Sequence, residues 1–179
     1  TSNYKILKNI YIDNKNITIT INNLWLSDIN PQAILYGANE TLSNGSSSLY
    51  VSNLTDFVST HPTQENITLQ TIDEYCQSNK IDHIHLLKID IEWHEFKCLK
   101  WAAKMLGLWT IDFIQFEFNR CVIWARVFFH DFWELLHEQY DFHRELALNK
   151  WFSKVNKYDI FYEQFYDANY LLIKKGIQL

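Results

Sequence analysis

Acidic and amide side chains stand at the ends of two apolar segments. Asp90 and Glu92 come at the end of His83–Ile91, and Glu117 and Asn119 come at the end of Ile111–Phe118. An ionised carboxylate in an apolar strand is costly unless a partner compensates it. Asp90 and Glu117 therefore predict a bound ligand, a metal ion or a structural ion pair with Lys or Arg, and the residues alone leave these alternatives open.

Other side chains with reactive groups are weaker candidates. His130 and His137 lie seven residues apart on one predicted helix, too far apart to ligate one metal ion together. We interpret His83 and His85, which alternate at the start of a strand, as ordinary residues. Cys98 falls in a predicted helix without a neighbouring His/Asp pair, which indicates a packed thiol.

Both apolar segments belong to consecutive strand–helix units. His83–Ile91 precedes a helical pattern, and Ile111–Phe118 precedes a helix from about residue 126 to 139 with Phe129 and Phe132 on one face. Two such units predict a parallel sheet with helices packed against it. Ligands of these sheets bind beyond the carboxyl ends of the strands, where the acidic residues fall.

Elements on either side complete the expected domain. Asn16–Asn22 is β-branched and predicts a strand, and Thr71 is placed to cap a helix that runs to about Asn79. Near the end of the chain, Ala168–Lys175 predicts a short strand at the edge of the sheet. We therefore expect residues 1–179 to belong to a single domain.

Composition excludes several classes of protein. The 179 residues are 47% hydrophobic, enough for one sizeable core. Lys and Arg number 16 against 21 Asp and Glu, a formal charge of −5, and the scattered positive charges argue against a nucleic-acid partner. No segment reaches the roughly 18 to 20 apolar residues of a membrane span. Three cysteines without a Cys-x-x-Cys pair favour a reducing, cytoplasmic location.

The segment LLKIDIEWHEFKCLKWAAKML, followed by IDFIQFEFN and FFHDFWELL, resembles the FkbM family of S-adenosylmethionine-dependent methyltransferases. Lys88, Asp90, Glu92 and Glu95 match the family's Lys-x-Asp-x-Glu-Gly-x-Glu motif. The upstream NNLWLSD and the closing ANYLLIKK follow in the family's order. Several ordered blocks are more specific than one short motif.

This resemblance implies a fold, a cofactor and a reaction. The implied fold is an α/β, Rossmann-like class I methyltransferase fold, with a mostly parallel sheet and helices on both faces, here lacking the first two strands. The implied reaction moves a methyl group from S-adenosyl-L-methionine to a hydroxyl of a sugar, glycan or secondary metabolite. A group must remove the hydroxyl proton, and a carboxylate or a divalent cation could do so.

Positions in the implied fold assign the site residues. The expected catalytic residues are Asp90 and Glu92. The expected cofactor-binding residues are Ser27, Asp28, Lys88 and Asp90. Substrate or possible metal binding is expected for His94, Glu95, Glu117 and Asn119.

The chain departs from the family at its start. A glycine-rich loop and an acid that hold the cofactor in this fold have no counterpart before Tyr4. We therefore expect this chain by itself to bind the cofactor weakly and to be inactive. The alternatives to a methyltransferase are a non-catalytic α/β module or inactive fragment, and a sugar-binding or sugar-transferring domain.

A second departure is compositional. The chain has 4 Gly and 7 Trp, whereas average usage predicts about 12 Gly. Trp25, Trp93 and Trp101 stand at glycines of the family pattern, and Trp109 and Trp151 fall at predicted loop or turn positions. We interpret these tryptophans as UGA codons that the natural host reads as glycine. The hypothesis also includes Trp124.

Overall fold

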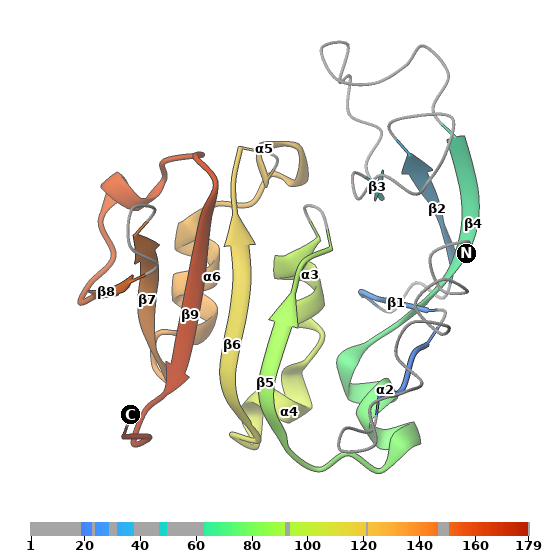
Figure 1. The fold of residues 1–179 in the computed structure, drawn as a ribbon, viewed down its shortest axis with the longest axis horizontal. Coiled ribbons are helices and arrows are strands. Elements are labelled where there is room, and N and C mark those ends of the chain that lie inside the picture. The colour runs from blue at the N-terminus through green and yellow to red at the C-terminus, as the bar shows by residue number, and fades with distance from the viewer. Residues whose placement is uncertain are drawn as a thin grey trace.

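A computed structural model describes residues 19–22, 24–28, 32–37, 47–49, 63–91, 94–120, 122–146 and 151–178. These residues form two sheets, which Figure 1 shows with the smaller one at the right. The smaller sheet holds, in spatial order, β1 (Trp25–Leu26), β4 (Thr63–Gln70), β2 (Gln32–Gly37) and β3 (Ser47–Ser48). Its β1–β4 pair is parallel and its other pairs are antiparallel.

The larger sheet has five strands. In spatial order they are β5 (Ile84–Ile89), β6 (Ile111–Phe118), β9 (Ala168–Lys174), β7 (Tyr140–Leu146) and β8 (Trp151–Val155). Only the β5–β6 pair of this sheet is parallel. Because β9 is antiparallel to both β6 and β7, the strands β5, β6 and β7 point in the same direction.

Short helices accompany the strands. They are α2 (Ile72–Asn79), α3 (Glu95–Lys100), α4 (Ala103–Gly107), α5 (Val122–Ala125), α6 (Phe129–Leu136) and the 3-10 turn η1 (Ile160–Tyr162). Thr71 caps α2 through a reciprocal pair with Glu74, since each backbone N–H donates to the other residue's side chain. The predicted helix from Thr71 to Asn79 is thereby confirmed.

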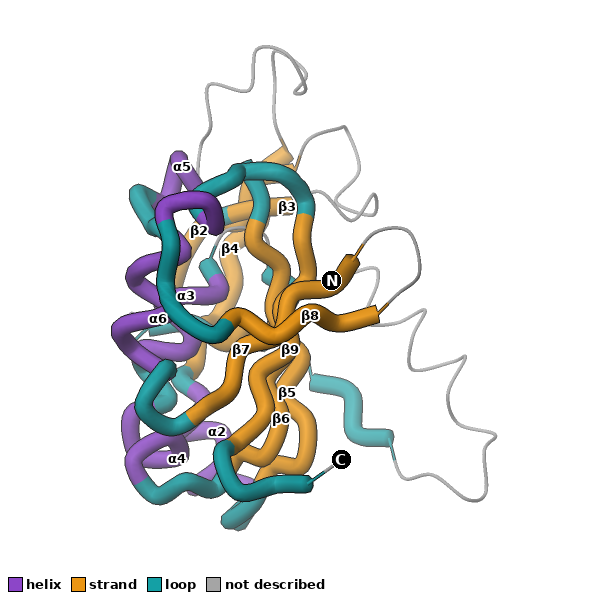
Figure 2. Tube along the Cα trace, turned by 90° about the vertical axis from the view of Figure 1, so that its left-hand side faces the viewer, coloured by secondary structure: helices purple, strands orange, loops and turns teal. Residues whose placement is uncertain are grey.

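The expected Rossmann-like, mostly parallel sheet with helices on both faces is wrong. Strand pairs in the described residues are mostly antiparallel, and α3, α4 and α6 lie on one side of the five-stranded sheet (Figure 2). One physical reason is the short connection between β7 and β8, since a parallel pair needs a crossover of a dozen or more residues. The second is β9, which enters antiparallel between β6 and β7.

Two strand predictions also need correction. β9 lies in the interior of the sheet, not at its edge, and Tyr170 and Leu172 are fully buried on it. Residues 19–22, the described part of the predicted strand Asn16–Asn22, are not in a strand, and β1 begins at Trp25. Propensity and alternation do not specify which neighbours a strand has.

The main core is aromatic and lies between the five-stranded sheet and its helices. Phe116 of β6 stacks on Phe132 of α6 with ring centroids 4.3 Å apart, and Phe129 packs on Tyr170 of β9. Leu99 of α3 is fully buried in the same core. A separate, smaller cluster in the other sheet contains Leu35, Ile67 and Leu69. This core positions the carboxyl ends of β5 and β6, where the predicted site residues Asp90 and Glu117 lie.

Candidate functional site

Asp90 follows the last residue of β5. Its carboxylate accepts a hydrogen bond from Lys88 Nζ at 2.7 Å, and both side chains are about half exposed. Lys88 and Asp90 are two residues apart, so they lie on one face of the strand. Of the alternatives that the sequence left open for Asp90, the structure shows an ion pair with lysine.

Glu117 lies beside this pair at the end of β6. The β5–β6 register pairs Ile89 with Phe116, and its continuation by one residue brings Asp90 next to Glu117. Burial raises the pKa of Glu117, the negative charges of Asp90 and Asp167 raise it further, and a hydrogen bond with Asn119 opposes them. Four of the predicted residues, Lys88, Asp90, Glu117 and Asn119, therefore form one group, which we call the strand-end cluster.

His94 and Glu95 lie at the start of α3 and are buried. Burial lowers the pKa of His94 to about 4, the charge of Lys97 lowers it too, and Asp28 opposes these effects. His94 is therefore neutral at pH 7. Glu95 accepts the backbone N–H of Ile91 at 3.0 Å, which closes the turn between β5 and α3. This contact gives Glu95 a structural part in shaping the site.

Ser27 and Asp28 follow β1 in the smaller sheet. The backbone N–H of Ser27 donates to the carbonyl of Gln70 at 2.9 Å and so extends the β1–β4 pairing. Ser27 is fully buried, and its Oγ has no hydrogen-bond partner among the described residues. Since Asp28 acts electrostatically on His94, the structure brings together two predicted residues that lie after β1 and at the start of α3.

Two residues of the predicted motif, Glu92 and Trp93, lie outside the described residues. One residue that the sequence analysis missed is Asp167, which acts on Glu117. Asp167 directly precedes β9, and the central position of β9 carries it to the carboxyl end of β6. Asp167 could have been found as an acid next to a predicted strand. The sequence analysis placed that strand at the edge of the sheet, away from Glu117, and so did not single out Asp167.

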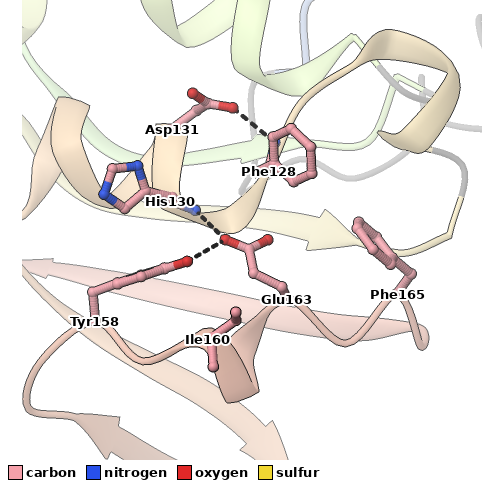
Figure 3. Close-up of a pocket in the computed structure, with 7 residues that line it drawn as sticks. All are labelled: Phe128, His130, Asp131, Tyr158, Ile160, Glu163 and Phe165. Carbon is pink, nitrogen blue, oxygen red and sulfur yellow. Dashed lines mark hydrogen bonds between the residues drawn. The ribbon is translucent and has the colours of Figure 1, made fainter.

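A hollow opens between the start of α6 and the turn η1 (Figure 3). It has a volume of about 500 Å³, and its lining is mainly apolar but includes four ionisable side chains. The lining residues are Phe128, His130, Asp131, Tyr158, Ile160, Glu163 and Phe165. Because Phe165 stacks on Phe118 of β6, the hollow adjoins the same strand end as Glu117.

Glu163 holds the two sides of the hollow together. Its carboxylate accepts the backbone N–H of Phe129 at 2.8 Å. It also accepts the backbone N–H of His130 at 2.9 Å, and the Tyr158 hydroxyl donates to it at 2.9 Å (Figure 3). Burial, followed by the interaction with Glu163, raises the pKa of Tyr158 to about 12. A carboxylate at the first turn of a helix is stabilised by the helix dipole. These hydrogen bonds therefore fix the start of α6 and the turn η1 relative to each other at the hollow.

Carboxylates at a strand end beside an apolar hollow are typical of a site that binds a small molecule. Comparison with protein-family models matches the Methyltransferase FkbM domain over residues 2–150. The chain therefore belongs to the FkbM methyltransferase family, as its motifs predicted. The same comparisons found no match among curated proteins or solved structures.

Among the described residues, none of the helices is both long enough and apolar enough to cross a bilayer.

Proposed function

We propose that this protein transfers a methyl group from S-adenosylmethionine to a hydroxyl group of a sugar, glycan or other secondary metabolite. The observation that carries this proposal is the strand-end cluster in a member of the FkbM family. We propose that residues 1–179 belong to one domain.

The donor set suits the cofactor. Acidic side chains attract a sulfonium cation and accept hydrogen bonds from ribose hydroxyls, and Asp90 and Asp28 provide carboxylates. The buried Oγ of Ser27 has no hydrogen-bond partner among the described residues, so it can form a hydrogen bond with the cofactor. We propose that Ser27, Asp28, Lys88 and Asp90 hold the cofactor, which supplies an electrophilic methyl group when bound.

Glu117 is the residue of the cluster best suited to accept a proton. A general base works best when its pKa approaches the working pH, and burial moves the pKa of Glu117 in that direction. Asn119 orients the carboxylate through its hydrogen bond. Asp90 and Glu92 remain the catalytic residues that the motif predicts. The alternative is that a divalent cation near these carboxylates promotes deprotonation of the acceptor hydroxyl.

The acceptor would occupy the hollow at the end of β6. Phe128 and Phe165 offer apolar ring faces, and His130 and Asp131 offer polar groups at the margin. Binding sites for small molecules commonly combine an apolar lining with a few polar groups that set orientation. An acceptor with both an apolar face and hydroxyl groups matches this lining.

The test uses the protein from its complete reading frame, S-adenosylmethionine with a labelled methyl group and a panel of glycans and hydroxylated metabolites. We expect labelled product, and we expect Glu117→Gln to lower kcat about a hundredfold or more, the range for loss of a general base. Glu134→Gln, an exposed acid on α6, is the matched control. Activity measured after chelation of divalent cations distinguishes the two means of deprotonation, because only the metal-dependent one is lost.

Two results would contradict the proposal. Absence of S-adenosylmethionine binding in calorimetry of the protein from its complete reading frame would favour a non-catalytic module. Full activity of Glu117→Gln would exclude Glu117 as the proton acceptor.

A further inference from the structure

Three potential metal ligands meet at the amino ends of β5 and β6, the opposite end of the sheet from the strand-end cluster. His83 directly precedes β5, His85 is its second residue, and Asp112 is the second residue of β6. Their ligand atoms all lie within 4.8 Å of one another. We call these residues the amino-end triad.

Strand geometry brings the triad together. His83 and His85 are two residues apart, so their side chains project from the same face. The parallel register pairs Ile84 with Ile111 and Leu86 with Phe113, which places His85 beside Asp112. The rings of His83 and His85 lie edge to face with centroids 4.6 Å apart. Three ligands from two hydrogen-bonded strands form a preorganised set.

The distance between two of the ligand atoms is close to that in a metal site. His83 Nε2 lies 2.8 Å from Asp112 Oδ2. Ligand atoms of a tetrahedral Zn²⁺ site lie about 3.3 Å apart, given metal–ligand bonds of 2.0–2.1 Å. The His83 side chain is 38% exposed, so its ring can turn by the small amount required.

Lys174 of β9 orients the carboxylate. Its Nζ donates to Asp112 Oδ1 and leaves Oδ2 directed at His83, and it also donates to the carbonyl of Trp109 at 3.2 Å. Metal-ligating carboxylates commonly have such hydrogen-bonded partners.

We propose that His83, His85 and Asp112 bind one Zn²⁺ ion, with water completing a tetrahedral coordination. Two imidazoles and one carboxylate form an established ligand set for zinc. The ion would tie together the starts of β5 and β6 at the edge of the five-stranded sheet. This site is independent of the methyltransferase proposal, because it shares no residue with the strand-end cluster.

Metal titration of the full chain tests the site. We expect one Zn²⁺ per chain in calorimetry, a rise in Tm with Zn²⁺, and the visible absorption of tetrahedral Co²⁺ when cobalt replaces zinc. His85→Ala should weaken Zn²⁺ binding at least tenfold and abolish the cobalt spectrum. His85 is exposed, and circular dichroism checks that the variant stays folded.

Two further variants sharpen the test. His130→Ala, on α6 and outside the triad, should bind Zn²⁺ like the parent chain. Lys174→Met should weaken binding about 10- to 100-fold, the usual effect of removing a partner of a metal ligand. Zinc binding that survives in both His83→Ala and His85→Ala, or no binding by the parent chain, would overturn the proposal and leave a His83–Asp112 ion pair.

Discussion

Trp109 follows the C-cap of helix α4 in a backbone conformation that favours glycine. Its φ is 59°, and the two hydrogen bonds that close the helix are present: Trp109 N–H donates to Leu106 O at 2.9 Å, and Thr110 N–H donates to Met105 O at 3.1 Å. This pattern is a Schellman motif, whose left-handed position is usually occupied by glycine. The structure thus supplies a physical reason to interpret Trp109 as a misread glycine codon.

We predict that Trp109→Gly raises the free energy of unfolding by about 1 kcal/mol, because a left-handed residue with a Cβ costs roughly 1–2 kcal/mol. Urea denaturation measures the change. Trp124→Gly is the matched control, since Trp124 is similarly exposed but lies in α5, where glycine costs about 1 kcal/mol. Equal destabilisation by both substitutions would contradict the explanation, and a UGG codon at position 109 would contradict the misreading itself.

Other tryptophans give no such conformational argument. Trp101 has a φ of −98°, and Trp25 and Trp151 begin strands, so the expected turn position of Trp151 is wrong. Trp93 lies outside the described residues. For these positions the glycine hypothesis rests on the family motif or on composition, and the gene's codons decide it.

At the scale of elements, β9 holds the five-stranded sheet together. It pairs with β6 along one side and with β7 along the other, so the last strand in the sequence is internal to the sheet. Leu172 is fully buried on the face that packs against the helices, whereas the neighbouring Leu171 is only partly buried on the other face.

We predict that Leu172→Ala lowers the free energy of unfolding by about 2–5 kcal/mol, the range for a buried leucine that leaves a cavity. Leu171→Ala, on the same strand, should cost clearly less. Chemical denaturation of the two variants gives the comparison. If the two losses were equal, the central position of β9 would be in doubt.

At the scale of the whole molecule, Asp73 links α2 to α4, a helix that packs in the main core against the five-stranded sheet. Its carboxylate accepts the backbone N–H groups of Lys104 and Met105 at 2.7 and 3.0 Å. These groups belong to the first turn of α4, whose own cap residue Ala102 has no side-chain acceptor. An acid from another helix therefore caps α4.

We predict that Asp73→Ala destabilises the protein by about 1–2 kcal/mol, the usual loss on removing a helix cap. Asp82→Ala, an exposed acid between α2 and β5, should stay within about 0.5 kcal/mol of the parent chain. Thermal and urea unfolding measure both variants. A neutral Asp73→Ala would show that water replaces this cap.

Local features of the fold followed from the sequence alone. The strand Ile111–Phe118 and the helix capped by Thr71 lie where the patterns predict, and the apolar face of α6 contains the expected Phe129 and Phe132. The family also followed, because its motif occupies consecutive residues. Each of these features depends on neighbours within a few positions of the chain.

Only the tertiary structure decided how distant segments pair. It placed β9 between β6 and β7 and brought His83 and His85 next to Asp112. It also paired the exposed Asp90 with Lys88 and left Glu117 partly buried. Strand pairing brings together residues far apart in sequence, and burial depends on which segments then cover them. Alternation and propensity contain neither kind of information, so the chemistry of these side chains emerges only when the sheet is assembled.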